Sequence, residues 1–101
     1  MLKKDYGASS DSCRVTFTLK QEEAAGAHEV FLVGDFNNWN PAASPMHANV
    51  AGNFELTIAL LSGHEYQYRF FLDGLRWEND WNADKYVGSP YGTTENSVVI
   101  V

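Results

Sequence analysis

The 101-residue chain contains a single cysteine, Cys13, so no disulfide can form within it and no zinc-ligand spacing is present. No apolar run approaches the roughly 18 residues that a membrane-spanning helix requires. Residues 1–12 contain two lysines with no apolar stretch behind them, which is not the pattern of a signal peptide. These absences favour a cytoplasmic protein that has no membrane partner.

Basic residues are also scarce. Seven Lys and Arg residues stand against 13 Asp and Glu residues, which gives a formal net charge of −6. Affinity for nucleic acid comes mainly from neutralising phosphates, and anionic membranes attract clustered basic residues, so both kinds of partner are disfavoured. A neutral ligand is indifferent to the sign of the net charge and remains compatible with this composition.

Apolar and polar residues alternate with a period of two along most of the chain, which predicts β-strands. We expect strands at residues 14–20, 29–33, 54–60, 66–72, 75–78 and 97–101. The second is apolar on both faces, which predicts a central position in its sheet, and Asp73-Gly74 predicts a tight hairpin. The window 21–27 is the most favourable for a helix but is too short. The fold class predicted is all-β, an antiparallel immunoglobulin-like β-sandwich.

The length is that of one domain. We expect residues 1–12 to form a flexible polar lead-in and residues 13–101 to form the sandwich. A domain of this size buries roughly two-thirds of the surface that its unfolded chain exposes, which is enough for a core without disulfides or metals.

Patterns that would indicate catalysis are weak. No nucleophile signature such as G-x-S-x-G is present, and the three histidines stand singly at expected loop positions. Glu78, Asp80 and Asp84 could supply paired carboxylates for glycoside hydrolysis, but a small sandwich rarely has the deep cleft that this reaction needs. A solvated acidic loop is the preferred interpretation. We therefore expect no catalytic residue, no metal ion and no cofactor.

Aromatic residues make up 14% of the chain, more than an ordinary core requires. In the expected strand 66–72, Arg69 and Phe71 share the face opposite the core face, and Trp77 follows on the return strand. If the loop GDFNNWNP folds toward that face, Trp39, Arg69 and Trp77 form one exposed platform. Indole rings suit a pyranose, whose C–H face covers the ring while its hydroxyls bond to polar groups at the rim. Composition leaves open the alternative that both tryptophans cap the core.

Several motifs together resemble a known family. They are VFLVGDFNNW at 30–39, YQYRFFLDG at 66–74, Trp77, Tyr91-Gly92 and ENSVV at 95–99. Over about residues 13–101 the chain resembles the family 48 carbohydrate-binding modules, which include the glycogen-binding domain of the AMP-activated protein kinase β subunit and the N-terminal early-set domains of isoamylases and branching enzymes. The resemblance implies an immunoglobulin-like sandwich of the early-set type that binds α-1,4-linked glucans and is not an enzyme.

The resemblance also implies carbohydrate-binding residues. Trp39 and Trp77 match the two stacking tryptophans of the family, and Arg69 matches a basic strand residue that hydrogen-bonds sugar hydroxyls. Tyr91 matches a bulky residue that packs against the sugar, although kinase-type members often carry leucine there. Arg in place of Lys keeps the charge and permits planar hydrogen bonding.

The last implied position falls on Glu95 or Asn96. Counting without gaps puts Glu95 at the sugar-contacting asparagine of the family, with Asn96 one residue later. Neighbouring residues of a strand face opposite ways, so only one of the two can serve. We favour Asn96.

The expected partner is an α-glucan polysaccharide, with a glycoside hydrolase or a kinase-type protein as a further partner. The competing hypothesis is a structural or protein-interaction early-set domain of a larger glucan-metabolising enzyme or complex, without sugar binding of its own. An exposed patch with Trp39, Phe71 and Trp77 would also suit a protein partner. The presence of both tryptophans and the basic residue favours sugar, because a spacer has no need of them.

Overall fold

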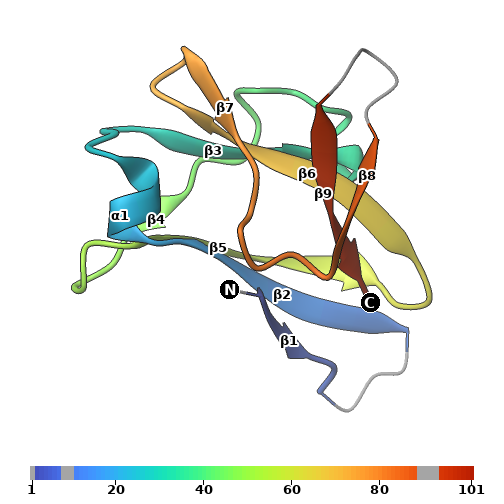
Figure 1. Cartoon of the computed structure of the whole chain (residues 1–101). Helices are drawn as coiled ribbons and strands as arrows, with labels where there is room; N and C mark the ends of the chain where they lie inside the picture. The colour runs from blue at the N-terminus through green and yellow to red at the C-terminus, as the bar shows by residue number, and fades with distance from the viewer. Residues whose placement is uncertain (1, 8–10, 89–93) are drawn as a thin grey trace.

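A computed structural model describes residues 2–7, 11–88 and 94–101. The strands are β1 Leu2–Asp5, β2 Ser12–Leu19, β3 Val30–Gly34, β4 His47–Ala48, β5 Phe54–Leu61, β6 Glu65–Leu72, β7 Arg76–Glu78, β8 Lys85–Gly88 and β9 Glu95–Ile100. They form two stacked antiparallel sheets (Figure 1). One has the order β1-β2-β5-β4, and the other has the order β3-β6-β9-β8 with β7 also paired to β6. The predicted all-β, immunoglobulin-like sandwich is confirmed.

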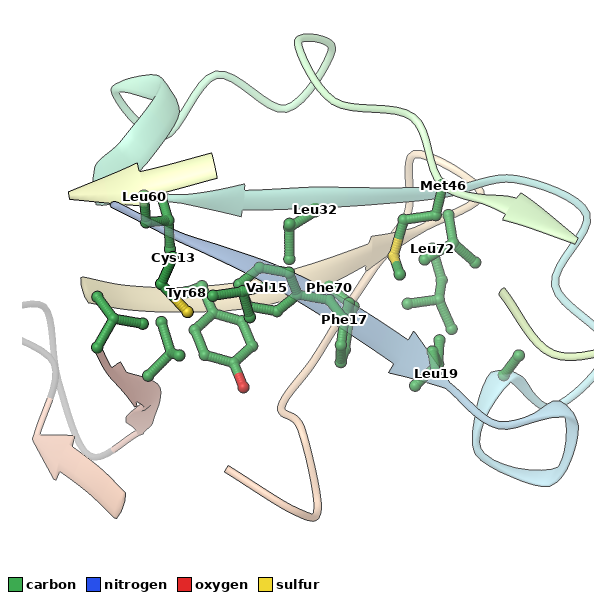
Figure 2. Packing of buried hydrophobic residues seen from close by; sticks show 14 residues of the cluster. Cys13, Val15, Phe17, Leu19, Leu32, Met46, Leu60, Tyr68, Phe70 and Leu72 are labelled. Carbon is green, nitrogen blue, oxygen red and sulfur yellow. The ribbon is translucent and has the colours of Figure 1, made fainter. Parts of the chain in front are cut away.

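The core forms where alternate side chains of β2 and β6 meet between the sheets (Figure 2). Tyr68 and Phe70 of β6 are fully buried, and the ring of Phe17 on β2 lies edge-on to Tyr68 with centroids 4.9 Å apart. Phe36, just beyond β3, extends this cluster, because its ring centroid lies 5.7 Å from that of Phe17 and 6.4 Å from that of Tyr68. Phe36 thereby anchors to the core the loop that carries Trp39.

β1 departs from the unstructured lead-in expected for residues 1–12. Leu2–Asp5 pairs with β2, with Leu2 opposite Phe17. Lys4 also forms an ion pair, its Nζ lying 2.8 Å from Asp84 Oδ2. The alternation that reveals a strand is missing here, because most side chains of this edge strand face solvent. Lysines on an edge strand discourage pairing with other chains.

β3 lies at the end of its sheet, so the prediction of a central strand is wrong. β6 flanks one side of β3. On the other side the segment 44–46 covers its edge, because Leu32 N donates to Ser44 O at 2.9 Å and Met46 N donates to Val30 O at 2.8 Å. Leu32 and Val33 point to opposite faces of the sheet, yet both are fully buried. Burial on both faces explains the apolar run without a central position.

The window 21–27 contains a single helical turn, α1 Gln21–Ala24, where its shortness predicts none. Its first turn is capped by one of its own residues, since the carboxylate of Glu23 accepts from Lys20 N, the N-cap residue, at 3.0 Å. A second turn, the 3-10 helix η1 Asp35–Asn37, follows β3 directly. The short strands β4 and β8 are also unpredicted, because two to four residues are too few to show a period.

Candidate functional site

The outer face of the five-stranded sheet, the face turned away from β2 and β5, carries Arg69 and Trp77. Tyr68 and Phe70 are buried in the core, so Arg69 between them points to the opposite side. Directly opposed residues of an antiparallel ladder share a face, and Trp77 of β7 stands opposite Phe71 of β6. Figure 1 shows the β6–β7 hairpin and the loop after β3 on this side of the sheet.

Trp77 packs against Phe71 and remains open to solvent. Their ring centroids are 4.3 Å apart with planes at 31°, and 43% of the Trp77 surface is exposed. The predicted hairpin is confirmed, because Asp73 and Gly74 have φ values of 55° and 67°, the left-handed pair of a type I′ turn. An indole supported on one side by a phenyl ring can present its other side to a ligand.

Arg69 is fixed against the beginning of β9. Its Nη2 donates to Thr94 Oγ1 and to Glu95 O, both at 2.8 Å. Its Nε is enclosed without an acceptor among the described residues. Arg69 and Trp77 are diagonal neighbours across the β6–β7 ladder, a relation that separates residues by about 7–8 Å. Arg69, with its guanidinium fixed to the start of β9, and Trp77 are thus neighbouring positions on the outer face.

Asn96, and not Glu95, shares the outer face with Arg69. Ser97 pairs with Tyr68 on the core side, so Asn96 points to the other side. Its Nδ2 donates to Gln67 Oε1 at 3.0 Å, and only 6% of its surface is exposed. Asn96 therefore lies beneath the outermost side chains of this face. Tyr91 lies outside the described residues.

Trp39 is partly buried in the loop that follows β3. Asn38 and Trp39 both adopt left-handed backbone conformations, with φ values of 57° and 56°, and Trp39 N donates to Gly34 O at 2.9 Å. The Trp39 Nε1–H donates to Asp35 Oδ1 at 2.8 Å. The indole is thus held by its own loop and is less exposed than a free-standing platform residue would be.

The side chain of Asn37 closes the same loop. Its Oδ1 accepts from Gly34 N at 3.0 Å, and its Nδ2 donates to Leu32 O at 2.9 Å and to Ser44 Oγ at 3.1 Å. One amide therefore ties η1 both to β3 and to the segment covering its edge. The polar neighbours of Trp39 hold the loop in its shape.

The two tryptophans are tied to opposite ends of a row along β6. Asp35 Oδ2 accepts from Gln67 N at 2.8 Å, which attaches the Trp39 loop at the Gln67 position. Trp77 stands opposite Phe71, at the other end. From Gln67 to Phe71 the strand rises about 13 Å, at roughly 3.3 Å per residue. A ligand reaching both ends of this row must be longer than one sugar ring.

Asp80 is buried, so the interpretation of the segment 78–84 as a solvated acidic loop is wrong at this residue. Its side chain accepts from the Tyr68 hydroxyl at 2.7 Å and from Asn82 N at 2.9 Å, and its own N–H donates to Ser97 Oγ at 2.9 Å. Only 1% of Asp80 is exposed. This carboxylate fastens the loop after β7 to the core side of the sheet.

The described residues include no group of three or more His, Cys, Asp or Glu residues that could hold a metal ion.

Two residues that support the site escape sequence reasoning. Asp35 joins Trp39 to β6, and its nearness in sequence to a loop tryptophan is the one available signal. Asn79 holds the start of β9, because its Nδ2 donates to Glu95 O at 2.7 Å and its Oδ1 accepts from Ser97 N and Oγ at 3.1 and 2.8 Å. Nothing in the sequence spacing points to Asn79, since its partners lie 16 and 18 residues away.

Comparison with known proteins assigns this chain to a family. The model of the family described as carbohydrate-binding module 48 (isoamylase N-terminal domain) matches residues 5–92. The chain belongs to the carbohydrate-binding module 48 family. Carbohydrate binding is thus the general class of function of this module, and its sandwich is of the early-set type.

Relatives of this carbohydrate-binding module 48 chain include subunits of a protein kinase. The 5'-AMP-activated protein kinase subunits beta-1 of Rattus norvegicus and Homo sapiens are each 37% identical to it over 75 residues, which is 74% of this chain and 26% of the relative. The beta-2 subunit of Mus musculus is 36% identical over 73 residues, 72% of this chain and 25% of the relative. The chain spans about a quarter of the length of these relatives.

The helices of the described residues are too short to include a membrane-spanning segment.

Proposed function

We propose that this module binds α-1,4-linked glucans such as glycogen and starch on its outer face and catalyses no reaction. The observation that carries the proposal is the exposed indole of Trp77, supported by Phe71 and diagonal to the fixed guanidinium of Arg69. The apolar face of a glucose ring can cover the indole while the guanidinium donates to its hydroxyls. Because the glucan is neutral, the net charge of −6 does not oppose its binding.

The remaining site residues take different roles in the proposal. Trp39 supplies a second ring face at the Gln67 end of β6, and Tyr91 packs against the sugar. Asn96, with 6% of its surface exposed, contributes through its amide and through the Gln67 side chain that it orients. Covering an indole face with a sugar ring stabilises the complex by about 1–2 kcal/mol, from about 25 cal/mol per Å² of apolar surface.

Affinity electrophoresis in gels with and without glycogen tests the proposal. We expect glycogen to retard the wild type, and Trp77→Ala to weaken the association by about 5- to 30-fold, the equivalent of 1–2 kcal/mol. Wild-type mobility that is identical in both gels would refute glucan binding. Retardation that survives Trp77→Ala, Trp39→Ala and Arg69→Ala would refute the assignment of the outer face.

Trp81→Ala is the matched control. Its indole is 62% exposed, more than that of Trp77. It follows Asp80, which is fastened to the core side of the sheet, and its Nε1 lies 3.5 Å from Glu78 Oε1. Glu78 stands opposite the core residue Phe70, so its side chain lies on the core side of the sheet, whereas Trp77 lies on the outer face. Trp81, beside Glu78, therefore stands on a different surface from Trp77. Its removal should leave the mobility in glycogen unchanged.

A second candidate function is a docking module for a glycoside hydrolase or a kinase-type partner. The observation that favours it is the exposure of Leu75 and Trp81, at 86% and 62%, two large apolar side chains outside the proposed sugar contacts. The relatives are also longer chains, of which this one matches about a quarter. The affinity gel separates the two candidates, because a docking module without sugar binding migrates identically with and without glycogen.

A further inference from the structure

We propose that Asp35 is a positioning residue, which holds the indole of Trp39 in the orientation that receives the glucan. The inference rests on the proposed function of the outer face. Asp35 Oδ1 accepts from Trp39 Nε1–H and Asp35 Oδ2 accepts from Gln67 N, both at 2.8 Å. One carboxylate thus bridges the ring of a loop residue and the backbone of β6.

The position of Asp35 explains why a carboxylate is useful there. β3 ends at Gly34, which pairs with Tyr68, so the ladder between β3 and β6 stops one residue before Gln67. Beyond that point the Asp35 side chain replaces the backbone of β3 as the acceptor, because its Oδ2 accepts from Gln67 N, the next backbone N–H of β6. Since β6 also carries Arg69, the carboxylate ties Trp39 to the same rigid strand that holds the guanidinium.

The backbone of Trp39 shows that this orientation is imposed. A φ value of 56° lies in the left-handed region, which a bulky aromatic residue rarely occupies. Such a conformation persists where surrounding contacts over-determine it, and it concentrates at functional sites. Here the contacts are the N–H of Trp39 on Gly34 O and its indole N–H on Asp35.

The contact also determines what Trp39 can offer a ligand. An indole has a single donor and no acceptor, and Asp35 already uses that donor. Trp39 therefore meets the sugar through its ring face alone, and this end of the site selects for an apolar ring surface. Recognition of hydroxyl groups is left to residues such as Arg69. Asp35 adds affinity by reducing the freedom that the indole would otherwise lose on binding.

A double-mutant cycle with a linear α-1,4-linked maltooligosaccharide tests the role of Asp35. In the wild type we expect Asp35→Ala to weaken binding by about 3- to 10-fold, the loss expected when one side chain is no longer held in place. In a Trp39→Phe background the same change should cost less than about twofold, because phenylalanine has no N–H to hold. An equal loss in both backgrounds would overturn the proposal, since Asp35 would then act through Gln67 alone. Asp5→Ala, which removes an exposed carboxylate from the other sheet, is the charge control.

Hydrogen exchange of the indole N–H groups, followed by NMR, gives a readout that needs no sugar. The Trp39 Nε1–H should exchange more slowly than that of exposed Trp77, and Asp35→Ala should remove the difference. Equal exchange in wild type and variant would overturn the contact. If Asp35→Ala does not fold, the wild type alone still tests the contact, because a Trp39 Nε1–H that exchanges as fast as that of Trp77 would overturn it. Failure of the wild type to bind any glucan overturns the proposed function, whereas failure of the cycle overturns only the role of Asp35.

Discussion

Replacing Tyr68 by phenylalanine removes one hydroxyl from the interior of the sandwich. That hydroxyl donates to Asp80 Oδ2 at 2.7 Å, and both residues are almost completely buried. Figure 2 shows the ring of Tyr68 among the core side chains of β2 and β6. The substitution keeps the ring and its contact with Phe17, but it takes one donor away from a buried carboxylate.

The expected cost follows from that geometry. A hydrogen bond to a charged group contributes about 1.5–3 kcal/mol, and a buried acceptor that loses its donor cannot turn to water instead. We therefore expect Tyr68→Phe to lower the free energy of unfolding by about 2 kcal/mol. In a domain of this length such a loss lowers Tm on the order of 10 °C. The loop after β7 should loosen as well, because Asp80 fastens it.

The same hydroxyl also makes the stability of the fold depend on pH in the alkaline range, which gives a second, independent test. Burial, reinforced by the negative charge of Asp80, raises the pKa of Tyr68 well above its usual value of 10.0. Above pH 10 the unfolded chain loses this proton while the folded chain keeps it, so the stability contributed by the neutral hydroxyl falls by up to about 1.4 kcal/mol per pH unit. The difference in stability between wild type and Tyr68→Phe should therefore shrink as the pH rises above 10.

Urea unfolding followed by circular dichroism at pH 7 and above pH 10 measures both effects. Tyr66→Phe is the matched control on the same strand, since its hydroxyl is exposed and lies 3.3 Å from Leu61 O. We expect it to change stability by less than about 0.5 kcal/mol. Equal losses for Tyr66→Phe and Tyr68→Phe, or a difference from wild type that stays constant above pH 10, would refute the reasoning.

Two further predictions concern the elements that carry the site. Gly34→Ala should cost about 1–3 kcal/mol in thermal or urea unfolding, because its Cβ would collide with the backbone oxygen of Gln67. Gly88→Ala, whose Cβ would meet none of the described residues, should cost much less. Equal costs would contradict the close approach of β3 and β6. Hydrogen bonds from the backbone of Glu29 and His28 lower the pKa of Asp73 below 3.8. The stability that this carboxylate contributes is present above pH 3.8 and is lost as the pH falls through its lowered pKa. Below pH 3.8 the free energy of unfolding of Asp73→Asn should therefore depend less steeply on pH than that of the wild type. An unchanged slope would count against the contact.

Local patterns were sufficient to predict the strands of the core and one face of the site. Alternation along β6 separates Tyr68 from Arg69, because successive side chains of a strand point to opposite faces. Asp73-Gly74 predicts the turn that brings Trp77 opposite Phe71, because two left-handed residues are what a type I′ turn needs. These features depend on a few neighbouring residues, so they can be read without knowledge of the rest of the chain.

Other features depend on partners distant in sequence. β3 reads as a central strand because it is buried on both faces, and only the fold shows that it ends its sheet with its edge covered by the segment 44–46. Asp80 reads as a surface acid, yet its place beside Tyr68 buries it. The apolar run of β3 indicates burial but not which segment provides it, and the burial of Asp80 leaves no local pattern at all.

The sequence by itself determined the fold class, the family and, apart from the choice between Glu95 and Asn96, the residues proposed to meet a sugar. Only the tertiary structure decided how those residues are held. It places Asn96 rather than Glu95 on the face of Arg69, fixes that guanidinium to the start of β9, and ties the indole of Trp39 to Asp35. The physical reason is that periodicity and turn chemistry act over a few residues, whereas strand register and hydrogen bonding join residues far apart in the chain. The orientation of the site is set by those long-range contacts.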